Sequence, residues 1–173
     1  MIPKAADCVR TMYNEVGYSC VGKKDKYALF FDKKMPNFYN GDKYGVADFC
    51  DIFFDYCIAI HCGGSEKDAE KVLCQPAKSA GAGVEWSYKY YKAKKRNTSI
   101  PHYGDQIFLS KNGKQSGLYH TGGVYKVTDK YVYFVAANEG TGKTRYTKKH
   151  KYLRTNKKIF AYGRPFYKDW REL

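Results

Sequence analysis

The chain has 173 residues and a mass of 19.9 kDa, enough for one ordinary domain but not for two. Apolar residues make up 43% of it, which excludes a largely disordered protein. The net charge of +14 predicts attraction to polyanions such as nucleic acid, anionic lipid or a phosphate-rich surface. No apolar run approaches the ~20 residues of a membrane span, and the first residues show no signal-peptide pattern.

Apolar residues in the first half recur at helical spacing. The pattern predicts helices over residues 4–18, 25–35, 49–62, 65–74 and 83–95. The stretch 49–62 is the most apolar, and a pair of glycines follows it, as expected where a helix ends. We therefore expect this helix to be buried.

The second half changes to short segments rich in β-branched and aromatic residues, separated by Gly, Asn and Asp. These segments predict strands at 104–110, 117–127 and 130–137, with a last strand within 158–167. Helices followed by antiparallel strands indicate an α+β fold. Neither half is large enough for its own core, so we expect one domain over 1–173.

The chain contains six cysteines at irregular spacings: Cys8, Cys20, Cys50, Cys57, Cys62 and Cys74. A domain of this size needs no disulfides, so we expect mostly reduced thiols. Cys57 and Cys62 flank His61, but the paired Cys-x-x-Cys spacing of a structural zinc site is absent. The sequence therefore predicts no metal centre here.

Cys50 is predicted in the first turn of the apolar helix. Asp48 and Asp51 have the spacing of an N-terminal cap. Unpaired N–H groups and the helix dipole at such a position favour a thiolate and would also stabilise an oxyanion. The alternative is that Cys50 is a small buried hydrophobe on the core face of the helix.

His120 lies in a predicted central strand, and Asn138 ends the next one. Cysteine with a histidine from a distant strand is the activated-thiol arrangement, and an amide that orients the imidazole completes a triad. Asn also ends strands for purely conformational reasons. His61 lies too far along the helix, roughly 16 Å from Cys50 by helix rise; we expect His102 in a loop and His150 in solvent.

Two other segments suggest rival functions. Residues 137–144 resemble a phosphate-binding loop, but the basic, β-branched sequence after them does not predict the helix that such a loop must open. Residues 143–158 interleave Lys and Arg with Tyr, a pattern that suits single-stranded nucleic acid and equally a protected edge strand.

Six motifs together resemble those of the CHAP-type domains, the cysteine- and histidine-dependent amidohydrolase/peptidases close to the NlpC-type cell-wall peptidases. In chain order they read GVADFCDIFFDYC, VLCQPAKSAGAG, PHYGDQIFLS, GLYHTGGVYKV, AAN and FAYGRPFY. The resemblance covers residues 4–167, and the nearest pattern is that of phage and prophage lysins of Gram-positive bacteria. It implies a papain-like fold with Cys50 as nucleophile, His120 as base and Asn138 as the third residue.

The sequence departs from the family pattern at three positions. Phe49 replaces a common Trp, Tyr119 replaces a small residue, and Ala136 stands where the family usually has a Glu that orients the histidine. Glu139 is next to Asn138, but a shift of one residue along a regular strand points to the opposite face. The missing acid makes a catalytically weak wall-binding homologue the first alternative.

The resemblance implies a monomeric peptidoglycan hydrolase without metal or cofactor, cutting either the muramoyl–L-alanine amide or a bond of the stem peptide or cross-bridge. We expect it to be made in the cytoplasm of a bacterium or phage-infected host and to act at the cell wall after release. Anionic wall polymers suit the positive charge, and Tyr-rich segments 37–46 and 86–91 are expected to line the cleft. A basic nucleic-acid-binding protein is the second alternative, supported by charge alone.

Overall fold

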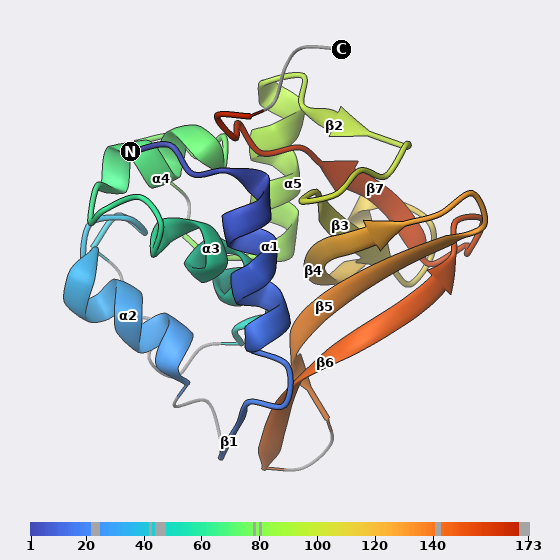
Figure 1. The fold of residues 1–173 in the computed structure, drawn as a ribbon, viewed down its shortest axis with the longest axis horizontal. Coiled ribbons are helices and arrows are strands. Elements are labelled where there is room, and N and C mark those ends of the chain that lie inside the picture. The colour runs from blue at the N-terminus through green and yellow to red at the C-terminus, as the bar shows by residue number, and fades with distance from the viewer. Residues whose placement is uncertain are drawn as a thin grey trace.

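A computed structural model describes residues 1–21, 25–41, 43, 48–77, 79, 81–140 and 143–169 (Figure 1). The described helices are α1 (Ala5–Asn14), α2 (Lys26–Lys34), α3 (Cys50–Ala59), α4 (Glu66–Val72) and α5 (Val84–Ala93). The described strands are β1 (Ser19–Val21), β2 (Asn97–Thr98), β3 (Gln106–Ser110), β4 (Leu118–Val127), β5 (Tyr131–Glu139), β6 (Thr144–Leu153) and β7 (Ile159–Gly163). The α+β prediction is confirmed.

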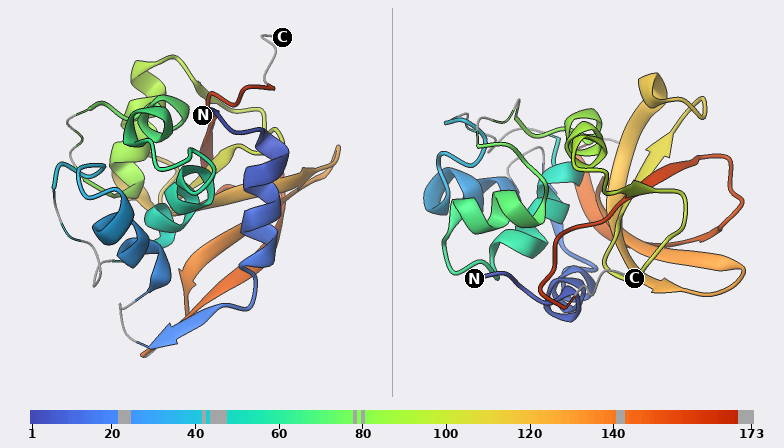
Figure 2. Two further views of the ribbon diagram at one scale, coloured as in Figure 1. Left: turned by 60° about the vertical axis from the view of Figure 1, so that its left-hand side comes forward. Right: turned by 90° about the horizontal axis from the view of Figure 1, so that it is seen from above.

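The strands form one antiparallel sheet in the order β1-β6-β5-β4-β3-β7-β2. Seen from above, the sheet curls strongly, and the helices gather on one side of it (Figure 2). α1, α3 and α5 all pack against β4, which lies at the centre of the sheet. Residues at the start of β4 are therefore held between the helices and the neighbouring strands.

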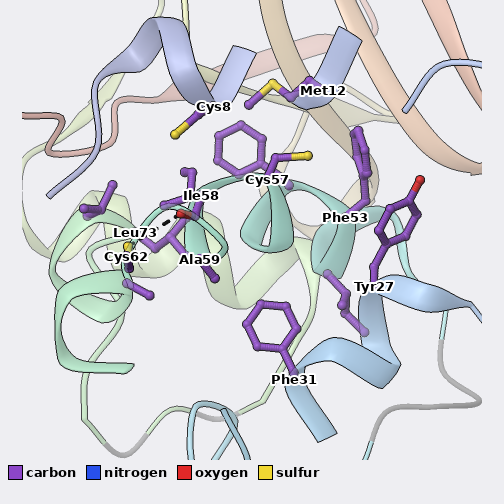
Figure 3. Packing of buried hydrophobic residues seen from close by; sticks show 14 of the residues in the cluster. Cys8, Met12, Tyr27, Phe31, Phe53, Cys57, Ile58, Ala59, Cys62 and Leu73 are labelled. Carbon is purple, nitrogen blue, oxygen red and sulfur yellow. Dashed lines mark hydrogen bonds between the residues drawn. The ribbon is translucent and has the colours of Figure 1, made fainter. Parts of the chain in front are cut away.

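The main core fills the space between the helices and the sheet, with α3 at its centre (Figure 3). In α3 every residue except Tyr56 is buried, which explains its continuous apolar sequence. Gly123 of β4 permits this packing, because a Cβ there would lie 2.2 Å from Met12 Sδ and 3.1 Å from Phe54. A second, smaller core lies within the curl of the sheet and includes Val124 and Phe134.

One buried carboxylate joins four elements beneath this core. Asp51 of α3 accepts hydrogen bonds from the Gly83 N–H and the Ser87 hydroxyl at the start of α5, both at 2.8 Å. Its other oxygen accepts from Gln106 Nε2 of β3 at 2.9 Å, and the same amide nitrogen lies 3.1 Å from the Thr121 hydroxyl of β4. The first turn of α3 is thereby fixed against two strands and a helix.

All six cysteines are free thiols in the structure, and five of them are buried. None of the helices in the described ranges is long and apolar enough to cross a membrane.

Asp25, the N-cap residue of α2, is fully buried, and its titration therefore tests the packing around this helix. Asp25 Oδ1 accepts the Ala28 N–H at 2.9 Å, whereas its buried Oδ2 has no hydrogen-bond partner among the described residues. Burial raises the pKa of Asp25 to about 6, above the value of about 3.9 in an unfolded chain. Its contribution to stability is therefore complete below about pH 4 and is lost as the pH rises through 6.

We expect Asp25→Asn to be more stable than the wild type at pH 7, by up to roughly 3 kcal/mol for a pKa raised to about 6, and equally stable at pH 4. Asn caps a helix as well as Asp does, so the substitution removes the titration but keeps the cap. Urea unfolding at both pH values measures the effect. A variant less stable at pH 7 would contradict the prediction, and Asp25→Ala provides the control that loses the cap at both pH values.

Candidate active site

Cys50 is the first residue of α3, as the sequence predicts, and the residue at the N-cap position is Phe49 rather than Asp48. Phe49 makes no side-chain hydrogen bond to the helix. The expected partner acid, Asp51, instead points into the buried network with Gln106. The helix start is held by burial and by the Asp51 carboxylate, and the Asp51 N–H hydrogen-bonds the Cys50 thiol.

The Cys50 thiol is enclosed. Its residue is 6% exposed, and burial raises the pKa of the thiol to about 12, with Asp51 adding to the effect. Hydrogen bonds from the backbone N–H groups of Asp51 and Thr121 act in the opposite direction. The thiol thus contacts β4 at Thr121, the residue that directly follows His120.

His120 lies in β4 as predicted, with its side chain 12% exposed. Neighbouring residues of a strand point to opposite faces. Thr121 faces the α3 side through Gln106, and His120 lines a cavity on the other side together with Phe134. Among the described residues, no hydrogen bond joins the Cys50 thiol to the His120 imidazole.

Glu139 is the residue that contacts His120, with Oε1 2.7 Å from the imidazole Nε2. The expectation that Glu139 points to the opposite face is wrong, because β5 is not regular there. Its register against β6 shifts between Ala136 and Glu139, and Asn138 has a φ of 64°. This bulge inserts one extra residue, so Glu139 faces the side that Ala136 faces.

Asn138 does not orient His120 in the structure. Its Nδ2 lies 3.4 Å from Asp48 Oδ1, while its Oδ1 is buried without a hydrogen-bond partner among the described residues. Asn tolerates the left-handed backbone that the bulge requires. The structural contribution of Asn138 is therefore to turn the chain so that Glu139 reaches His120, and to bring β5 next to the residues preceding Cys50.

His150 of β6 also contacts Glu139, contrary to the expectation that it lies in solvent. Its Nε2 is 3.0 Å from Glu139 Oε1, its side chain is 23% exposed, and its ring stacks on Phe134 at 4.8 Å. Burial would raise the pKa of Glu139, but the contacts with His120 and His150 outweigh it and hold the pKa well below its ordinary value. The sequence did not indicate a role for His150, because lysines flank it on both sides and predict a solvent-exposed segment.

His120, Glu139 and His150 border a cavity of about 320 Å³. It lies on the face of the sheet that carries the second, smaller core. Its lining within the described residues is Leu109, Tyr119, His120, Phe134, Asn138, Glu139, Gly140, His150 and Tyr152. Cys50 is not part of this lining. The structure thus brings His120 and Glu139 together in a cavity, and the Cys50 thiol to the backbone N–H of the neighbouring residue Thr121.

The remaining candidates take no part in this arrangement. His61 lies just after α3 and hydrogen-bonds Thr11 at 2.8 Å. β6 begins at Thr144, so no helix follows the phosphate-loop-like segment, of which residues 141 and 142 lie outside the described part. In the described chain, no group of three or more His, Cys, Asp or Glu could hold a metal ion.

Where they are described, the Tyr-rich segments 37–46 and 86–91 contribute no residue to the lining of the cavity at His120. Residues 86–91 belong to α5, where Tyr88 and Tyr91 are buried. In the segment 37–46, Phe38 and Tyr39 are buried in the core, and residues 42 and 44–46 lie outside the described residues.

Comparison of the chain with protein-family models, with curated proteins and with solved structures found no match.

The enclosed thiol leads to a prediction about its reactivity. With a pKa raised to about 12, the thiolate fraction of Cys50 increases about tenfold per pH unit. We expect labelling of Cys50 by iodoacetamide to rise continuously from pH 7 to pH 10, as measured by mass spectrometry of the Cys50 peptide. Cys20, which is only half-buried, provides the internal comparison and is expected to label faster. A plateau below pH 8 would contradict the prediction.

Proposed function

We propose that the protein is a papain-like cysteine hydrolase of bacterial peptidoglycan, cutting the muramoyl–L-alanine amide or a peptide bond of the stem or cross-bridge. The observation that carries the proposal is the 2.7 Å contact between His120 and Glu139, next to the strand residue whose N–H reaches the Cys50 thiol. Through this contact Glu139 orients the His120 imidazole, as the resemblance requires. The sequence pattern did not identify Glu139 as the orienting acid.

In the proposed reaction, Cys50 Sγ attacks the amide carbonyl carbon, and His120 takes the thiol proton and returns it to the leaving amine. Because Nε2 donates to Glu139, Nδ1 is the nitrogen available for this proton. Backbone N–H groups at the start of α3 stabilise the oxyanion. Water, deprotonated by His120, then hydrolyses the thioester and frees Cys50.

The thiol and the imidazole are not hydrogen-bonded within the described residues, so in this proposal they come into contact when substrate binds. Such contacts are often long in the absence of substrate. The raised pKa of Cys50 means that proton transfer to His120 accompanies the attack rather than preceding it.

A wall-binding protein with little activity is the second candidate. The enclosure of the Cys50 thiol and its absence from the lining of the cavity at His120 favour it. The charge of +14 suits a wall that carries anionic polymers under either candidate. The presence of a satisfied His120–Glu139 pair favours the hydrolase.

The decisive experiment measures clearing of purified Gram-positive peptidoglycan by the monomeric protein, followed by mass spectrometry of the products. We expect Cys50→Ala and His120→Ala to abolish clearing. Glu139→Gln should lower the rate by about 10²–10⁴-fold, as loss of an orienting acid does in other triads. New peptide or amino-sugar ends identify the cleaved bond.

Asn138→Gly is the matched control for Glu139→Gln, because Gly keeps the left-handed backbone and removes the amide. We expect it to retain activity within about tenfold of the wild type. Equal loss in Asn138→Gly and Glu139→Gln would indicate that the Asn138 amide is required as much as the Glu139 carboxylate. No clearing by the wild type on several walls, with wall binding intact, would establish the binding protein instead.

A further inference from the structure

Four tyrosines form a continuous row across α1, β4 and β5, on the helix-bearing side of the sheet. The Tyr13 and Tyr125 rings meet edge to face at 5.6 Å, Tyr125 and Tyr133 lie 6.1 Å apart, and Tyr133 and Tyr131 lie 6.3 Å apart. Tyr13 is 48% exposed. The row is thus partly exposed, with Tyr125 also packed against the main core.

Lysine ammonium groups lie over these rings at short range. Lys149 is 3.8 Å from the Tyr13 centroid, Lys151 is 4.1 Å from that of Tyr131, and Lys126 is 5.4 Å from that of Tyr133. Each contact is a cation–π interaction that restricts an otherwise mobile side chain. We call the eight residues of this region the lysine–tyrosine surface: Tyr13, Tyr125, Lys126, Lys130, Tyr131, Tyr133, Lys149 and Lys151.

The charge of this surface is nearly uncompensated by acids. From Gln106 to Lys168 the sequence has two acidic residues, Asp129 and Glu139. Glu139 is bound to two histidines on the inner side of the sheet. No ion pair to Lys126, Lys149 or Lys151 occurs within the described residues, so these ammonium groups are available to an external anion.

The arrangement of the rings distinguishes between two kinds of polyanion. Single-stranded nucleic acid needs open aromatic faces on which successive bases stack. Here neighbouring rings are tilted by 56–77° to each other, and ammonium groups already lie over the faces of Tyr13, Tyr131 and Tyr133. The surface thus presents positioned cations rather than stacking platforms, which favours phosphates without bases.

A shallow cavity of about 340 Å³ adjoins this row. It is lined by Val9, Arg10, Tyr13, Asn14, Tyr103 and Tyr125. Tyr13 and Tyr125 belong to both features, so a chain crossing the lysines would reach the cavity directly. Its tyrosine hydroxyls and Asn14 amide suit the hydroxyl groups of a polyol or sugar.

We propose that the lysine–tyrosine surface is a second binding site, taking a polyol-phosphate polymer of the Gram-positive wall such as a teichoic acid. Lys126, Lys149 and Lys151 bind successive phosphates, and the adjoining cavity receives a polyol or sugar unit. Tyr125 follows His120 by five residues of β4, roughly 17 Å along the strand, so the polymer leaves the proposed cleavage site free. This inference deepens the proposed function, on which it rests.

The test measures binding to purified walls before and after removal of teichoic acid, in a Cys50→Ala background so that no cleavage intervenes. We expect Lys149→Ala/Lys151→Ala to weaken binding to intact walls roughly tenfold at low salt, with a smaller effect at high salt. The matched control is Lys33→Ala/Lys34→Ala, which removes the same charge from exposed positions at the end of α2.

Tyr133→Leu tests positioning separately from charge, because it removes the ring beneath Lys126 and Lys151 and leaves the net charge unchanged. We expect a weakening of several-fold, with folding checked by circular dichroism. Equal binding to stripped and intact walls, equal loss in the α2 control, or tighter binding to oligo-dT than to isolated teichoic acid would each overturn the proposal. Intact binding without clearing by the Cys50-containing protein would refute only the hydrolase.

Discussion

The buried carboxylate of Asp51 is the constraint on which the arrangement of this protein depends. A carboxylate removed from water is costly unless donors surround it, and here three donors from α5 and β3 do so. Burial nonetheless raises its pKa, which the hydrogen bonds only partly offset. Moving α3 relative to the sheet would leave several buried groups unpaired at once, so the first turn of this helix has one position.

That constraint determines where Cys50 lies. The residue next to it in the chain is fixed, and Gln106 links the same carboxylate to Thr121. The thiol therefore faces β4 one residue from His120. Glu139 and His150 form a polar group with the His120 side chain. The fold thus delivers a thiol and an oriented imidazole to two adjacent residues of β4.

Local pattern was sufficient for much of this fold. Helical periodicity located α1, α3 and α5, and alternation with turn residues located β3, β4 and β5. For the basic segment 143–158 it offered only an edge strand or a nucleic-acid-binding segment, whereas β6 pairs with both β1 and β5 and Thr147 is buried. β1 and β2, with three and two residues, carry no periodic signal. The predicted helix and strand were enough to place Cys50 and His120. The contact of Glu139 with His120 depends on the bulge in β5, which a period-two strand pattern does not predict.

Because of the bulge at Asn138, the acid that contacts His120 does not have to occupy position 136. In a regular strand, an acid at position 136 would face His120; here the same face is reached three residues later through one residue in a left-handed conformation. Insertion or deletion of a single residue in this turn of the chain would exchange which side chain meets the imidazole. In related proteins, a one-residue change of chain length can therefore supply an acid to the histidine from a different position. A position-by-position comparison of the sequences would record that acid as lost.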